Sequence, residues 1–97
     1  MKYLVMATPL PIPIPPELFQ EARDWIGERI NDRRFECVYL FLGGGGVAIR
    51  NAGSHEEVHE ELLAYPLYRF FDWSVEPLVN WEHGFGTIIR GLEGARG

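Results

Sequence analysis

Residues 55–59 read H-E-x-x-H, a spacing that places two imidazoles on one face of a helix beside a glutamate. Such a pair holds zinc when a third ligand joins it, and Glu82 or His83 offers one further along the chain. The same spacing aligns both histidines with the apolar stripe of Val58 and Leu62, which faces or borders a helix–sheet core with little room for metal and water. We therefore expect no metal site here.

A second set of side chains has the types needed to move a proton on a carbonyl compound. Asp72, Ser74 and Glu76 alternate with apolar residues and so share the polar side of a predicted strand. If the aliphatic residues of the two preceding strands face the helices, strand parity places Tyr39 and Arg50 on the same open side. A buried carboxylate can abstract a proton beside a carbonyl, an arginine can grip a carboxylate at two points, and a tyrosine can stabilise an enolate.

These side chains predict a site for catalysis and substrate binding on the open side of the sheet. The alternative is that Arg50 pairs with Asp72 or Glu76 in a plain cross-strand or subunit contact. Trp73 belongs to an aromatic-rich C-terminal third that lines a ligand cavity or a subunit contact. The predicted site comprises catalytic Asp72, Glu76 and Tyr39 and substrate-binding Arg50, Ser74 and Trp73.

Composition limits the classes of function. The chain has 97 residues, enough for one domain, and a net charge of −5, which opposes nucleic acid and anionic membrane surfaces. A single cysteine, Cys37, excludes an intramolecular disulfide and suits a reducing compartment, so we expect a cytoplasmic protein. Prolines interrupt the apolar stretch at the N-terminus, which argues against a secretory signal peptide. No apolar run reaches the length of a membrane span.

The elements that position the site follow the order β-α-β-β-α-β. Ser54 and Glu57 form a capping box at the start of the second helix, and Pro66 ends it. The order predicts one α+β, ferredoxin-like domain: a four-stranded antiparallel sheet with two helices on one face. Residues 79–97 would be an extension in subunit contacts, with a further short strand at 87–92. The strands are predicted at residues 2–8, 35–42, 47–52 and 70–78, and the helices at 16–31 and from 55 to about 65. The glycine run at residues 43–46 is predicted to form the turn between the second and third strands.

The other face of this sheet predicts a partner. The strand over residues 35–42 is apolar on both sides, with Phe35, Cys37, Tyr39 and Phe41 on one and Val38, Leu40 and Leu42 on the other. Left uncovered, such a face would expose a large apolar patch. We therefore expect a homodimer or a higher homo-oligomer, with two sheets face to face or a barrel closed across a dimer.

Two stretches carry a resemblance to a known family. Residues S54-x-E56-x-x-H59-x-x-L62 and P66-L67-Y68-x-x-F71-D72-x-x-V75-x-P77-L78 resemble the muconolactone delta-isomerase-like proteins of the dimeric α+β barrel superfamily. The resemblance implies a barrel built from two chains, rings of dimers, and an isomerase or cyclase that needs no cofactor. Such an enzyme moves a proton on a small carbonyl or lactone compound.

Two other functions remain open. The chain has Leu4 and Met6 where the resemblance implies a histidine and a lysine facing the ligand. This replacement favours a non-catalytic module that binds a small ligand or serves oligomeric assembly. The third possibility is a cofactor-free monooxygenase, as in neighbouring dimeric-barrel families.

Overall fold

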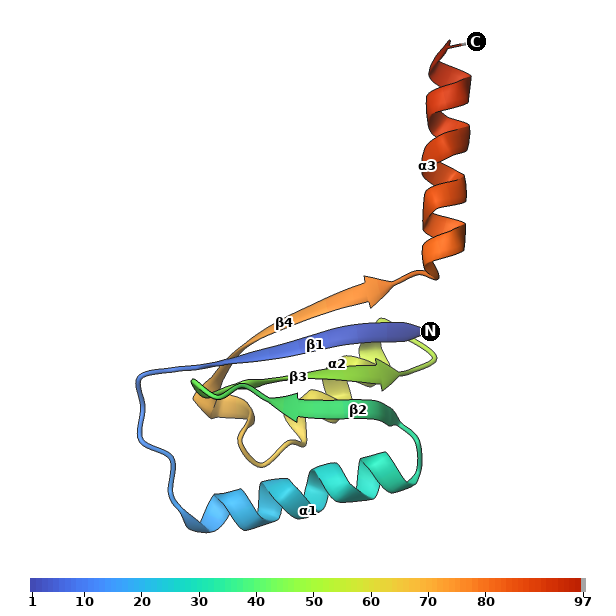
Figure 1. Cartoon of the computed structure of the whole chain (residues 1–97). Coiled ribbons are helices and arrows are strands. Elements are labelled where there is room, and N and C mark those ends of the chain that lie inside the picture. The colour runs from blue at the N-terminus through green and yellow to red at the C-terminus, as the bar shows by residue number, and fades with distance from the viewer. Residues whose placement is uncertain (97) are drawn as a thin grey trace.

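The computed structural model describes residues 1–96 of the chain. It has the predicted element order, followed by one further helix (Figure 1). The elements are β1 (Lys2–Pro9), α1 (Glu17–Asn31), β2 (Phe35–Leu40), β3 (Gly46–Asn51), α2 (His55–Leu63), the 3-10 turn η1 (Tyr68–Phe70), β4 (Phe71–Leu78) and α3 (Trp81–Arg96).

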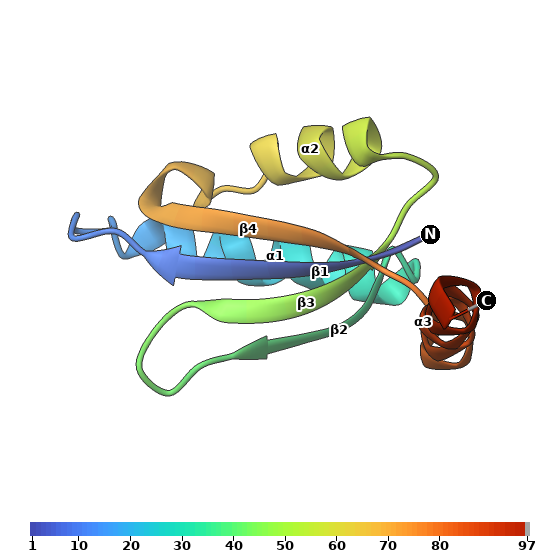
Figure 2. The same ribbon diagram turned by 90° about the horizontal axis from the view of Figure 1, so that it is seen from above.

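The four strands form one antiparallel sheet in the order β2-β3-β1-β4, which confirms the ferredoxin-like prediction. Val5 on β1 belongs to the core, and Val58 and Leu62 of α2 pack against the same cluster. Trp25 of α1 packs against this cluster as well, so both helices cover one face of the sheet. Figure 2 shows α2 along one side of the sheet, with the opposite side uncovered.

The start of α2 is capped nearly as predicted. Ser54 Oγ accepts a hydrogen bond from the Glu57 amide at 3.2 Å. The Glu57 carboxylate reaches back one residue further than a standard capping box requires and accepts from the Gly53 amide at 2.5 Å. The helix ends at Leu63, shortly before Pro66.

The glycine run joins β2 to β3 in a tight hairpin. Gly44 and Gly45 have φ angles of +100° and +83°, a region that side chains other than glycine rarely adopt. At Gly45 a Cβ atom would also stand only 2.2 Å from the carbonyl oxygen of Ala7. These glycines therefore serve the turn, as the sequence predicts.

The prediction of which residues of β3 face the helices was wrong. The register aligns Val38 with Ala48, and Ala48 with Val5, so these three share the helix-covered face. Val47 and Ile49 therefore point to the open face, opposite to the prediction.

β2 also departs from simple alternation. A register shift between Phe35 and Cys37 places Phe35 on the helix-covered side, where it is buried, while Cys37 faces the open side. A bulge adds one residue to one strand. A prediction that assumes strict alternation along β2 therefore assigns the residues before the bulge to the wrong face.

The C-terminal extension is a helix, and the prediction of a strand at residues 87–92 was wrong. Asn80 caps it: its Oδ1 accepts from the Glu82 amide at 2.9 Å. Apolar side chains recur at helical spacing and override the β-branched pair in its middle. The exposed ones are Trp81, Phe85, Ile88, Ile89 and Leu92.

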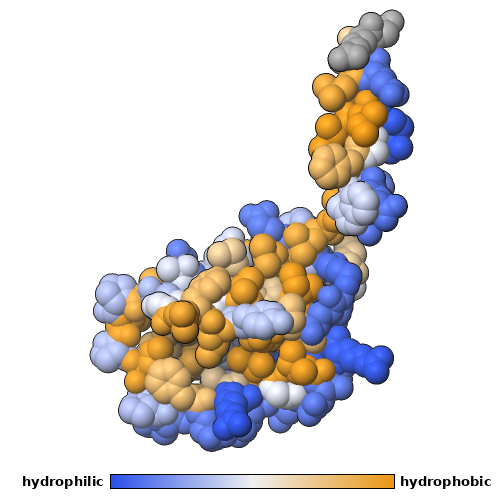
Figure 3. Space-filling view, in the orientation of Figure 1, coloured by the Kyte–Doolittle hydropathy of each residue, from blue (hydrophilic) through white to orange (hydrophobic). Residues whose placement is uncertain are grey.

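Helix α3 projects away from the body of the molecule beyond the β4 edge (Figure 1). Its apolar side is continuous in the space-filling view, which also shows apolar side chains gathered over the sheet (Figure 3). No helix among residues 1–96 combines the length and the hydropathy needed to span a membrane.

Candidate functional site

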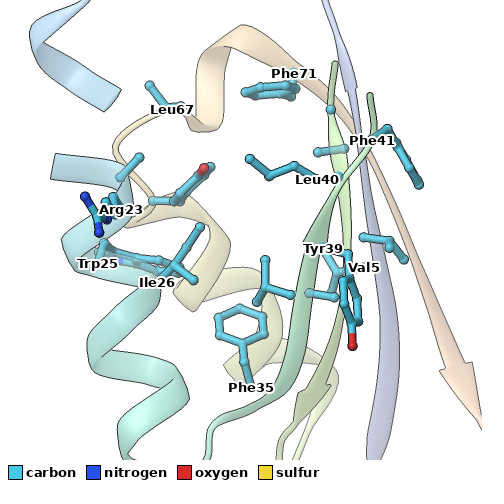
Figure 4. Close-up of a pocket in the computed structure, with 18 of the residues that line it drawn as sticks. Val5, Arg23, Trp25, Ile26, Phe35, Tyr39, Leu40, Phe41, Leu67 and Phe71 are labelled. Carbon is cyan, nitrogen blue, oxygen red and sulfur yellow. The ribbon is translucent and has the colours of Figure 1, made fainter. Parts of the chain in front are cut away.

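A cavity of about 770 Å³ lies between α1 and the helix-covered face of β2 and β3; we call it the α1 cavity. Trp25 and Ile26 line it from the helix, and Phe35, Val38 and Leu40 from β2. Figure 4 shows these elements facing one another across an open space. Its volume falls in the range typical of small-molecule sites.

The walls of this cavity are mainly apolar, with few polar groups. Tyr65 lines it from the segment after α2, and burial raises the pKa of the Tyr65 hydroxyl. The hydroxyl therefore stays protonated at neutral pH and can donate a hydrogen bond. Arg23 lines the cavity from the exposed side of α1. None of the residues that line it in the described chain is an aspartate, a glutamate or a histidine.

The cavity extends around the sheet edge at β2 and the glycine hairpin. Leu40, on the α1 side of β2, is 78% exposed. Tyr39 and Phe41 also border the cavity but lie on the far side of β2 from α1 (Figure 4). Phe19, from the first turn of α1, is half exposed. A ring of apolar side chains therefore surrounds the mouth.

Four of the six predicted site residues lie on the open face of the sheet. Asp72, Ser74 and Glu76 share one side of β4, where Ser74 aligns with Met6 of β1. Tyr39 is on the same face but on β2, at the opposite edge. Three strand spacings separate it from the β4 trio, roughly 14 Å. One chain therefore does not bring Tyr39 to these carboxylates.

Arg50 lies on the helix-covered face, so its predicted placement on the open face was wrong. The register pairs it with Phe35 and Tyr3, and it is 2% exposed. Its guanidinium forms ion pairs with Glu61 at 3.7 Å and Glu57 at 4.0 Å, both from α2. The side-chain Nε has no hydrogen-bond partner among residues 1–96.

Glu61 of α2 is the centre of a charged cluster with three arginines. One of its carboxylate oxygens accepts from Arg29 Nε at 2.9 Å and from Arg34 Nη1 at 3.0 Å. Arg50 approaches the same oxygen. This cluster joins α1, the turn before β2, β3 and α2, and its role is structural.

Trp73 lies on the helix-covered face of β4, unlike the other predicted site residues of this strand. It lines a cavity there. Its indole N–H donates to the Tyr68 carbonyl oxygen at 2.8 Å, and its ring stacks on that of Tyr68. It borders the α1 cavity on one side and a second space on the other.

The second space, the α2 cavity, has a volume of about 430 Å³ and lies between α2 and the β1–β4 side of the sheet. Both histidines of the H-E-x-x-H motif line it. Among residues 1–96 no three side chains of the metal-binding types come together as a metal site requires. The dispensability of metal therefore stays a prediction.

Sequence reasoning missed the α1 cavity, and it included Tyr65 only as one member of the aromatic-rich C-terminal third, without a role as hydrogen-bond donor. An apolar helix stripe, here including Ile26 and Ile30, is the same whether the helix packs closely on a sheet or stands off from it. The only available signal was that β2 is apolar on both faces, with more apolar surface than one helix covers.

Comparison with known proteins supports the fold. No family model matches the chain, and no curated protein sequence matches it significantly. The structure of muconolactone isomerase superposes with a TM-score of 0.69 at 19% identity, covering 82% of this chain and 90% of that one. A dehydrochlorinase from Burkholderia phenoliruptrix AC1100, TftG, superposes with a TM-score of 0.62 at 18% identity, covering 86% and 98%. The chain therefore has the fold of muconolactone isomerase and TftG.

Proposed function

We propose that the chain binds a small, largely apolar ring compound with a carbonyl group in the α1 cavity and isomerises or cyclises it by proton transfer without a cofactor. The observation that carries this proposal is the α1 cavity itself: about 770 Å³, mainly apolar walls, and a protonated tyrosine hydroxyl. A ring would lie against Trp25 and Trp73, and Tyr65 would donate to its carbonyl oxygen. A donor at that position stabilises the enolate formed when a proton leaves the adjacent carbon.

The similar structures support the class of ligand. Their names refer to muconolactone and to 5-chloro-2-hydroxyhydroquinone, and TftG was solved with 2,5-dihydroxybenzoquinone. These are small oxygenated ring compounds, and the α1 cavity has room for one. We take 2,5-dihydroxybenzoquinone as the first probe.

The second candidate is a binding module without catalysis. It is favoured by the absence of any carboxylate or imidazole among the described residues that line the α1 cavity. Proton abstraction needs a base within hydrogen-bond reach of the substrate. Tyr39, Asp72 and Glu76 remain predictions for that role, and in one chain only Tyr39 borders the cavity.

We further propose that the protein is a homo-oligomer in which α3 contacts a second copy of this chain. β2 and β4 are the two edges of the sheet, and α3 extends beyond the β4 edge while the α1 cavity opens at the β2 edge. The proposed contact places the β4 edge of one copy beside the β2 edge of another, with α3 against the apolar mouth that includes Phe19 and Leu40.

The charges beside α3 and the area that it can bury both suit its contact with the mouth of the α1 cavity. Glu82 and Glu93 flank the apolar side of α3, and Arg23 lies at the mouth of the cavity. The five exposed apolar side chains of α3 would bury roughly 500 Å² on the helix alone. A symmetric dimer would contain two such contacts. When the helix and the surface that receives it are both counted in each contact, the buried area reaches roughly 2,000 Å², enough for a stable dimer.

Ligand binding in the α1 cavity is tested by placing a larger side chain at its mouth. Leu40 is largely exposed, so Leu40→Trp can be accommodated without overpacking the core, and it should weaken 2,5-dihydroxybenzoquinone at least tenfold in a calorimetric titration. Leu63→Trp is the matched control, because Leu63 is exposed on α2 and lines neither cavity. Equal affinity in both variants would exclude the α1 cavity as the site.

The test of catalysis follows solvent deuterium into a bound lactone by NMR. Incorporation that depends on the protein and falls at least tenfold in Tyr65→Phe supports the isomerase. If the lactone binds but takes up deuterium no faster than in buffer alone, the protein is a binding module and not an isomerase.

A further inference from the structure

We propose that the α2 cavity is a second ligand site, which binds a small neutral aromatic ring carrying a hydroxyl group. In this site, an imidazole of His55 or His59 accepts the hydrogen bond of that hydroxyl. The proposal is independent of the function assigned to the α1 cavity, because only Leu62 and Trp73 line both spaces.

The walls of the α2 cavity suit a flat ring. The rings of Tyr68 and Trp73 stack at 5.8 Å with an angle of 12° between their planes. The indole N–H of Trp73 is already used by the Tyr68 carbonyl, so the tryptophan offers the cavity an apolar surface. Val75 and Pro77 border the space from the edge strand β4, which leaves it open at that side.

The polar groups lie on the opposite side of the same space. His55 and His59 are one helical turn apart on α2 and therefore point the same way. The ring of Tyr3 meets the ring of His55 edge to face at 5.3 Å, which orients this imidazole.

Tyr3 contributes a hydroxyl with spare hydrogen-bonding capacity. Its residue is 1% exposed, and among residues 1–96 the hydroxyl has one partner, Met1 Sδ at 3.9 Å. A thioether is a weak acceptor, and buried hydroxyl groups normally have better partners. An oxygen atom of a ligand would satisfy this group.

Charge selects the neutral form of the ligand. Glu56 and Glu60 directly follow the two histidines, both are exposed, and the chain carries a net charge of −5. Negative charge nearby opposes the binding of a carboxylate. A phenol therefore fits this site, and a benzoate of the same ring size does not.

The experiment uses NMR of the histidine Cε1–H signals in the full chain, titrated with phenol and, separately, with benzoate. The chain has three histidines, and His83 on α3 lines neither cavity, so its signal is an internal control. Phenol should shift the signals of His55 and His59 in a saturable way and leave that of His83 in place. Benzoate should bind at least tenfold more weakly. Because the two reporting signals come from the α2 cavity, phenol bound only in the α1 cavity would leave them unchanged.

Two variants complete the test. His59→Gln should weaken phenol about three- to tenfold in the shift of the His55 signal, the loss expected for one hydrogen bond. His83→Gln, the matched control, should change nothing. The proposal is overturned if neither cavity histidine shows a saturable shift, if His83 moves with them, or if benzoate binds as tightly as phenol.

Discussion

The two ends of α1 are held to the sheet in different ways. At its C-terminal end Arg29 pairs with Glu61 of α2 at 2.9 Å and stacks over Trp25 at 3.7 Å, and Phe35 beneath is buried. At its N-terminal end, Phe19 is 51% exposed and the nearby hairpin residue Leu40 is 78% exposed. The C-terminal end of the helix is therefore closed against the sheet. Its N-terminal half packs through Leu18 and Ala22 against Leu67 and Phe70 and leaves an open end toward β2.

This difference shows how a small domain makes room for a ligand. A 97-residue chain has little core to spare, and an evenly packed helix would fill the space over β2 and β3. The charge cluster ties one end of α1 to the sheet, and the other end packs against Leu67 and Phe70 instead of against β2, so a cavity stays open between them. The cost is exposed apolar surface at the open end, which a partner would cover.

The largest effect should come from breaking the anchor. Glu61→Ala leaves Arg50 buried without its nearest carboxylate, and we expect the free energy of unfolding in urea to fall by about 3–5 kcal/mol. Glu36→Ala removes a carboxylate from an exposed ion pair with Lys2 and should cost less than about 1 kcal/mol. Equal losses in the two variants would show that the cluster does not anchor the closed end.

A slightly smaller effect is expected at α3. Ile88→Asp places a charge on its apolar side, and burying that charge at a subunit contact should raise the dissociation constant of the oligomer about a hundredfold. Sedimentation velocity measures this change. Thr87→Asp, on the polar side of the same helix, is the control and should leave assembly unchanged. A folded 11.1 kDa monomer of the unmodified chain at micromolar concentration would refute the proposed contact.

The hairpin at the open end gives the next prediction. Gly45→Ala combines a positive φ with a Cβ contact of 2.2 Å to backbone, so we expect a loss of about 1–3 kcal/mol. Gly43→Ala has no atom within 4 Å of the added Cβ and should be nearly neutral. Thermal unfolding of the pair tests whether this turn is rigid; a similar melting temperature for both would mean that the hairpin adapts.

The smallest effect concerns the buried hydroxyl of the α1 cavity. Burial raises the pKa of Tyr65 in the folded chain above the usual tyrosine value of about 10. Its contribution to stability is therefore present below about pH 10 and is lost as the pH rises through the folded pKa, because the unfolded chain releases the proton first. Tyr65→Phe should flatten the fall in stability between pH 9 and pH 11. An unchanged slope would place this hydroxyl in water.

Local signals in the sequence predicted most of the elements. The Ser54 cap, the Pro66 stop and the glycine run acted through backbone chemistry within a few residues, so the ends of α2 and the turn could be inferred without tertiary contacts. The order of elements then left the ferredoxin-like sheet as the natural arrangement, which the strand pairing confirms.

The sequence by itself determined which residues alternate and which recur at helical spacing; the tertiary structure decided which side of each element is inside. Arg50 shows the difference. The pairing of Ala48 with Val5 and Val38 turns that side of β3, and Arg50 with it, toward α2, where Glu61 neutralises its charge. Facing depends on register and on partners distant in sequence, and period alone carries neither. The α1 cavity has the same origin: whether a helix packs or stands off depends on where its ends are anchored, and those anchors come from three other elements.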